Sequence, residues 1–112
     1  MKHLYGDFSD KQINETLVSM HNDIHKLLLF KDPNITETIF DSEDDFIKYF
    51  TNLLFRFGGL NDLLGKPAKM VDFMSTLQAA YEEVNKDYFI YKRFRKAILD
   101  CHGYLKEFSE GE

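Results

Sequence analysis

The sequence predicts an all-α protein: a four-helix bundle with a short additional helix between the second and third long helices. Two observations carry this prediction. Apolar residues recur at spacings of three and four over four long stretches, as they do on the buried face of a helix. No segment of useful length alternates polar and apolar residues, as a half-buried strand does. With 112 residues, we expect residues 1–112 to form a single helical domain around one core.

The first helix is expected to run from about residue 10 to residue 31. Ser9 and Gln12 form a capping-box pair, in which each side chain satisfies a backbone N–H of the first turn. Pro33 ends the helix, because a proline disfavours the helical conformation of the residue before it. The apolar stripe of this helix consists of Ile13, Leu17, Met20, Ile24 and Leu27.

The second helix is expected to begin in "DSEDD" (41–45), where Ser42 can cap it and acidic side chains meet the positive end of the helix dipole. Gly58 and Gly59 are expected to end it, because glycine readily takes the left-handed conformation of helix C-termini. The segment "LNDLLGKP" (60–67) then forms the short additional helix. The stripe of the second helix consists of Phe46, Phe50, Leu53 and Phe57.

Two further helices complete the bundle. Pro67 suits the first position of the third helix, because its missing N–H would have no partner there. Asp87 is the expected cap of the fourth helix, and Gly103 is expected to loosen that helix near its end. The two stripes consist of Met70, Met74, Leu77, Tyr81 and Val84, and of Ile90, Phe94, Ala97, Cys101, Leu105 and Phe108.

Composition and charge limit the function classes. The single cysteine fits a reducing compartment, and the N-terminal segment lacks the apolar core of a signal peptide. No apolar run approaches the ~18 residues of a membrane-spanning helix. We therefore expect a soluble, cytoplasmic protein that does not use a membrane. The formal net charge of −5 argues against general binding of nucleic acid. Residues 1–45 hold 10 acidic and 4 basic side chains, and residues 46–112 hold 9 and 10.

The stretch "HNDIHK" (21–26) is the first candidate site. His21 and His25 stand one turn apart, which allows two imidazoles to chelate one Zn²⁺ ion. A zinc site needs further ligands, and only the fold can bring His3 or His102 to this pair. The position after the first histidine, where a metalloprotease has its catalytic glutamate, holds Asn22. We interpret the pair as boundary residues and expect no metal or cofactor, with metal binding through His21 and His25 as an alternative.

The segment "DCHG" (100–103) brings a cysteine and a histidine together, as a thiol nucleophile and its base require. Adjacent residues of a helix point ~100° apart, and Cys101 falls on the apolar stripe. We interpret Cys101 as a small buried residue. The chain also lacks a phosphate-binding glycine loop, a nucleophile elbow and paired zinc-binding cysteines. We therefore expect no enzyme and assign no catalytic residues.

Charged and aromatic residues provide the candidate surface for a partner. The acidic group at 43–45 is interpreted first as a helix start and alternatively as a mimic of DNA phosphates. The basic group at 92–96 is interpreted first as a solvated face and alternatively as a nucleic-acid site. The chain holds 11 Phe and 6 Tyr, and several of them fall off the stripes, namely Tyr49, Phe55, Tyr88, Phe89 and Tyr91. Such residues either form a second core layer or contact another chain.

The segments "IHKLLLFKDP", "LLFRFGGLNDLLG" and "FRKAILDCHGYL" resemble small all-helical proteins that phages and prophages of Gram-positive bacteria encode. The resemblance lies in short length, richness in lysine and asparagine, and abundant phenylalanine and tyrosine. It implies a stoichiometric inhibitor of a host or defence protein, or an assembly factor of the virion, acting in the host cytoplasm. It transfers no functional residues to this chain.

These observations predict a non-catalytic helical module that binds a larger protein partner. Aromatic residues would supply affinity, and separate acidic and basic faces would set the orientation. Self-association through the aromatic face is a further possibility. Nucleic acid is not the expected partner, but binding of nucleic acid through the basic residues stays an alternative. The expected contact residues are Tyr88, Phe89, Tyr91, Lys92, Arg93, Arg95, Lys96, Glu43, Asp44 and Asp45.

Overall fold

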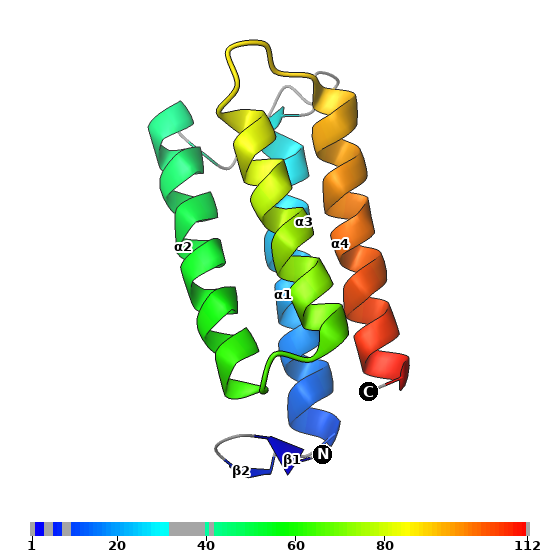
Figure 1. Cartoon of the computed structure of the whole chain (residues 1–112). Helices are drawn as coiled ribbons and strands as arrows, with labels where there is room; N and C mark the ends of the chain where they lie inside the picture. Colours follow the sequence, from blue (N-terminus) through cyan, green and yellow to red (C-terminus); the bar gives the residue numbers. More distant parts are fainter. Residues whose placement is uncertain (1, 4–5, 8–9, 32–39, 41, 112) are drawn as a thin grey trace.

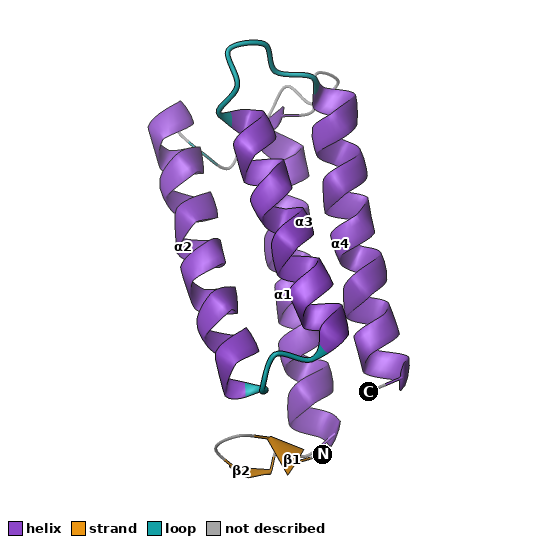
Figure 2. Cartoon of the chain, viewed as in Figure 1, coloured by secondary structure: helices purple, strands orange, loops and turns teal. Residues whose placement is uncertain are grey.

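The computed structural model describes residues 2–3, 6–7, 10–31, 40 and 42–111. The described residues form four helices and a pair of two-residue strands (Figure 2). The elements are β1 (Lys2–His3), β2 (Gly6–Asp7), α1 (Asp10–Lys31), α2 (Glu43–Leu63), α3 (Ala68–Val84) and α4 (Tyr91–Gly111). The predicted all-α class is therefore confirmed for the described part of the chain.

Successive helices run in opposite directions, so that the chain goes up α1, down α2, up α3 and down α4 (Figure 1). Each helix packs against its neighbour in sequence, and α1 also packs against α4. The α3–α4 contact is the most extensive and the α1–α2 contact the least. The strands β1 and β2 pair in antiparallel fashion at the end of the bundle where α1 begins.

Helix α1 has the predicted bounds. The proposed cap Ser9 and the terminating Pro33 lie outside the described residues. The predicted stripe is buried at Leu17, Met20, Ile24 and Leu27, which are all at most 6% exposed, and the side chain of Ile13 lies outside the described ones. The spacing of four and three therefore identified the buried face of α1 correctly.

The predicted end of the second helix at Gly58 and Gly59 is wrong. Helix α2 continues through both glycines to Leu63, so that no separate short helix lies between α2 and α3. A glycine inside a helix costs roughly 0.5–1 kcal/mol, and burial of the following Leu64 offsets this cost. The left-handed glycine of the helix end is Gly65, with φ of 82°.

The start of α3 after Pro67 agrees with the prediction, whereas the predicted cap of α4 does not. Helix α4 begins at Tyr91, four residues beyond Asp87. The carbonyl of Ile90 accepts the first backbone hydrogen bonds, at 3.1 Å from the Arg93 nitrogen and at 3.3 Å from that of residue 94. Gly103 lies within a helix that continues to residue 111, so the predicted loosening near Gly103 is not seen.

Aromatic rings fill much of the core. The Phe50 ring contacts Tyr81 of α3 and Phe94 of α4, with ring centres 5.2 and 6.3 Å apart. Phe89 and Tyr91 also pack on the Phe94 ring, at 5.8 and 6.3 Å. The sequence left open whether the aromatic residues off the stripes form a second core layer or contact another chain. Two of them, Phe89 and Tyr91, belong to a second core layer.

Candidate functional site

The stretch 21–26 sends its side chains to two different neighbours. Asp23 faces α2, where its carbonyl oxygen accepts a hydrogen bond of 2.8 Å from the Tyr49 hydroxyl. Its carboxylate lies 3.3 Å from the Arg56 guanidinium. Burial, and then the negative charge of Asp23, raise the pKa of Tyr49 to about 12, against a smaller lowering by Arg56. These contacts tie α1 to α2, the two neighbouring helices with the least extensive packing.

The two histidines of the stretch face α4 instead. The His21 and His25 rings are nearly parallel, with centres 6.4 Å apart. His102 of α4 reaches them, with its ring centre 3.8 Å from that of His21 and 6.0 Å from that of His25. The fold therefore brings together three histidines that lie up to 81 residues apart in the chain. We call His21, His25 and His102 the histidine cluster.

Neither ring nitrogen of His102 has a hydrogen-bond partner among the described residues, although both nitrogen atoms are buried. Burial, and then the nearby His21 and His25, lower the pKa of His102 to about 4. His102 and His21 also line a depression of about 430 Å³ between α1 and α4. In the described part of the chain, and with the side chains as they stand, no three His, Cys, Asp or Glu groups are arranged to hold a metal ion.

Cys101 is a buried core residue, as predicted. Its side chain is fully buried, and burial followed by the charge of Asp100 raises the thiol pKa to about 12. The thiol lies 3.8 Å from the carbonyl oxygen of Phe73, to which it donates a weak hydrogen bond. His102, the next residue, points to α1, so the two side chains do not form a nucleophile and base pair.

The basic residues at the start of α4 are all exposed. Lys96 pairs with Asp100 at 2.8 Å, which makes it the only member of the group with an ion pair to a described residue. The group lines a depression of about 650 Å³ on the outer side of the helix, together with Ile90, Leu99 and Asp100. We call Lys92, Arg93, Arg95 and Lys96 the basic cluster.

The acidic residues at the start of α2 are exposed as well. The Ser42 hydroxyl oxygen accepts a hydrogen bond of 3.2 Å from the backbone N–H of Asp45, which confirms the predicted cap. We call Glu43, Asp44 and Asp45 the acidic cluster. It lies in the first turn of α2, where negative charge is favourable.

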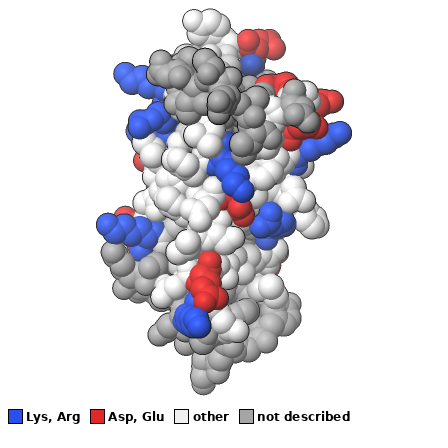
Figure 3. Space-filling model, turned by 180° about the vertical axis from the view of Figure 1, so that it is seen from behind, with Lys and Arg blue, Asp and Glu red and all other residues white. Residues whose placement is uncertain are grey.

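The two charged clusters lie at the same end of the bundle, because α2 and α4 both run down from it (Figure 1). Seen from behind, Lys and Arg side chains gather at that end over α4, and Asp and Glu side chains gather over α2 (Figure 3). A partner that meets this end of the protein would therefore meet both signs of charge.

The aromatic residues proposed as contacts differ in their exposure. Tyr88, in the connection between α3 and α4, is 80% exposed, whereas Phe89 and Tyr91 pack against the core. Phe55 of α2, which the sequence placed off the stripe but which was not among the expected contact residues, is 83% exposed. Its place off the apolar stripe was the available signal, but that signal also marks Tyr49, which is partly buried.

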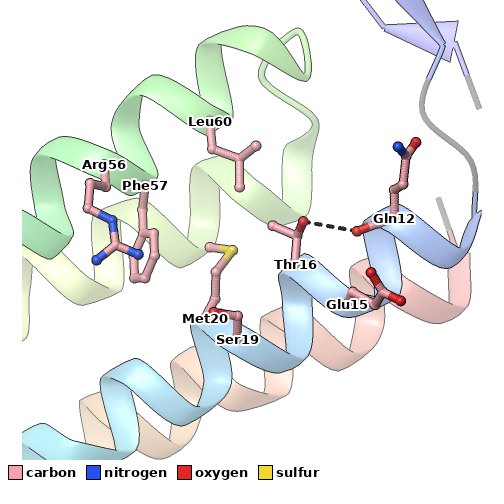
Figure 4. Close-up of a pocket in the computed structure, with 8 residues that line it drawn as sticks. All are labelled: Gln12, Glu15, Thr16, Ser19, Met20, Arg56, Phe57 and Leu60. Carbon is pink, nitrogen blue, oxygen red and sulfur yellow. Dashed lines mark hydrogen bonds between the residues drawn. The ribbon is translucent and has the colours of Figure 1, made fainter.

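Sequence reasoning also missed a groove between α1 and α2, which has a volume of about 560 Å³. Figure 4 shows Met20 of α1 pointing across this space toward Phe57 and Leu60 of α2. Polar residues of α1 form its other wall, and the Thr16 hydroxyl donates to the Gln12 carbonyl oxygen at 2.9 Å. No pattern along one helix could reveal this groove, because it depends on the separation of two helices.

Comparison of the chain with protein-family models, with curated proteins and with solved structures found no match. A search of the described residues for a membrane-crossing helix was also negative, since none of their helices combines the necessary length with enough apolar character.

Proposed function

We propose that the protein is a non-catalytic helical module that binds a larger protein partner through the end of the bundle where α2 and α4 begin. The observation that carries the proposal is the basic cluster at the start of α4. Tyr88 and the acidic cluster lie at the same end. The resemblance to phage proteins adds that the partner would be a host protein, a defence protein or a virion component.

The basic cluster is placed where it weakens the helix that carries it. The N-terminus of a helix bears a partial positive charge, so each cation in the first turn costs about 0.3–1 kcal/mol. Lys92 and Arg93 lie in this turn, and neither makes an ion pair with a described residue. The fold gains nothing from these charges. An anionic surface outside the chain would account for them, because it would be attracted by both the cations and the helix dipole.

Tyr88 supports the same end as the contact surface. It is 80% exposed and lies close in sequence to the basic cluster. Tyrosine is enriched among the residues that dominate binding energy, because it buries a large area and also offers a hydroxyl. In the free protein most of this side chain is exposed, and a partner that covers it would bury this area.

The charges favour a protein over a nucleic acid as the partner. The basic cluster alone would suit phosphates, but the acidic cluster at the same end would repel the backbone of a polyanion. A protein surface can present both signs of charge, with acidic groups against α4 and basic groups against α2. We therefore propose an acidic patch on the partner that faces the basic cluster.

Affinity capture from nuclease-treated lysate of the natural host tests the proposal. The tagged protein should retain one protein at near-equal stoichiometry. Changing Lys92→Gln with Arg93→Gln, or Tyr88→Ser alone, should reduce capture at least about tenfold, as expected for residues at the centre of an interface. The control Lys11→Gln with Lys106→Gln removes the same charge at the opposite end and should leave capture unchanged.

Each other outcome would point away from this function. Equal capture by the Lys92/Arg93 variant and the control would remove the basic cluster from the interface. Material that disappears on nuclease treatment, with an affinity that falls steeply with salt, would support nucleic-acid binding instead. Recovery of nothing but further copies of the chain would indicate self-association.

A further inference from the structure

We propose that His21, His25 and His102 bind one transition-metal ion of the Zn²⁺ type and thereby link α1 to α4. This inference is independent of the partner-binding function, because the histidine cluster lies between helices and away from the basic cluster. It rests on the approach of His102 to the other two rings, and on the lack of a hydrogen-bond partner for its nitrogens in the described part of the chain.

The ring spacings are close to those that a shared metal ion needs. Tetrahedral geometry with Zn–N bonds of about 2.0–2.1 Å places the centres of two ligating imidazoles roughly 5 Å apart. The three spacings in the cluster are 3.8, 6.0 and 6.4 Å, so they lie on both sides of this value. Binding therefore needs the His21 ring to move away from His102 and the His25 ring to move closer, each by a shift of about 1 Å.

Side-chain rotation can supply these shifts without movement of the helices. His21 and His25 are both exposed, so solvent leaves room for their rings to turn. A departure from a preferred side-chain rotamer costs of order 0.5–1.5 kcal/mol, which is small beside the free energy of metal ligation. The His21 and His102 rings are tilted by 35° with their centres 3.8 Å apart, so they must separate before they can share an ion.

The ligand chemistry favours ions that prefer imidazole. Neither ring nitrogen of His102 has a hydrogen-bond partner among the described residues, so no described group competes with a metal ion for its lone pair. No carboxylate lines the depression beside His21 and His102, and Lys106 does. A site of three nitrogen ligands suits Zn²⁺, Ni²⁺ and Cu²⁺, whereas Mg²⁺ and Ca²⁺ prefer oxygen. A water molecule in the depression can complete the coordination.

Calorimetric titration of the purified, chelator-treated protein with Zn²⁺ tests the proposal. We expect one Zn²⁺ ion per chain. His102→Gln and His25→Gln should each weaken binding by at least about tenfold, as loss of support for a bound metal does. His3→Gln is the matched control, because His3 is the fourth histidine and lies in β1, outside the cluster. Mg²⁺ at the same concentrations should not bind.

Thermal unfolding gives a second measurement that separates binding from folding. Zn²⁺ should raise the melting temperature of the wild-type protein and of His3→Gln, because the ion binds only the folded arrangement of α1 and α4. It should not raise that of His102→Gln, whose helical circular dichroism shows whether the variant is folded. Absence of saturable Zn²⁺ binding to the wild-type protein would overturn the proposal. Equal affinity in His102→Gln would overturn it as well.

Discussion

The first turns of α2 and α4 lie at the same end of the bundle and carry charges of opposite sign. Helix α2 begins after Ser42, which caps it, and continues with three carboxylates. Helix α4 begins after Ile90, whose side chain offers no hydrogen-bond acceptor, and continues with Lys92 and Arg93. The cap and the charges both favour the start of α2, and neither favours the start of α4.

The difference separates residues that serve the fold from residues that serve something else. The acidic cluster stabilises α2 whether or not a partner exists, so its presence says little about binding. Lys92 and Arg93 of the basic cluster oppose the dipole of α4 and make no ion pair with a described residue, so an isolated chain gains nothing from them. A residue placed against its local physical preference is therefore better evidence for a binding surface than one placed in agreement with it.

The largest expected effect comes from reversing the favourable charges. The double change Asp44→Lys with Asp45→Lys removes two stabilising charges and introduces two unfavourable ones. At about 0.3–1 kcal/mol for each, the free energy of unfolding should fall by about 2 kcal/mol. Urea unfolding at low ionic strength measures it, and high salt should shrink the loss. As a control, Glu82→Lys reverses an acidic side chain in the last turn of α3, and there stability should rise slightly.

The two neighbours of α1 show the same contrast. Toward α2, Tyr49 and Arg56 satisfy the polar groups of Asp23. Toward α4, both ring nitrogens of His102 are buried and have no partner among the residues that the structure describes. A buried polar group that lacks a hydrogen bond costs about 1–3 kcal/mol. The contact with α2 is therefore structural, whereas the histidine cluster costs stability.

In metal-free buffer, a fall in pH should destabilise the folded protein through His102. The pKa of His102 is about 4 when folded, against an ordinary value of 6.5, so the folded chain binds fewer protons between these values. Stability from this group is complete above about pH 6.5 and is lost as the pH falls toward about 4. The full difference in pKa corresponds to about 3 kcal/mol, and because the ring is partly exposed we expect a loss of about 1 kcal/mol.

The measurement is urea unfolding of the wild-type protein and of His102→Gln at several pH values between 4 and 7, with a chelator present. The difference in unfolding free energy between the two proteins should change by about 1 kcal/mol over this interval. Parallel curves would mean that His102 takes up a proton as readily in the folded chain as in the unfolded one. Carboxylates also titrate in this range, but they are common to both proteins and cancel in the difference.

Local patterns predicted the fold where local physics decides it. The bounds of α1 and the Ser42 cap followed from spacing and capping chemistry. Gly58 and Gly59 misled the prediction, because a glycine pair marks a helix end only if the chain leaves the helix there. Leu64 belongs to the core and Leu60 packs against it, and their burial keeps both glycines helical. That choice depends on tertiary packing, which the spacing of residues within one helix does not report.

The candidate sites divide in the same way. Sequence alone predicted the basic cluster and Tyr88 as contact residues, and the structure shows that these side chains are exposed. It could not bring His102 to the other two histidines, since that contact depends on how α4 packs against α1. It also treated Phe89 and Tyr91 as equals of Tyr88. Only the packing of the Phe94 ring distinguishes them.

The smallest expected effect decides whether the start of α4 is specialised for binding. Lys92→Gln with Arg93→Gln removes two cations from the positive end of the helix, so the free energy of unfolding should stay level or rise by about 0.5 kcal/mol. Urea unfolding at low ionic strength measures this change, with the Lys11/Lys106 double variant as the reference for lost charge. A gain in stability that accompanies a loss of partner capture would show that these residues oppose the fold and serve the interface. A clear loss of stability would mean that the cations support the bundle through contacts of their own, and the contrast between α2 and α4 would then carry no information about binding.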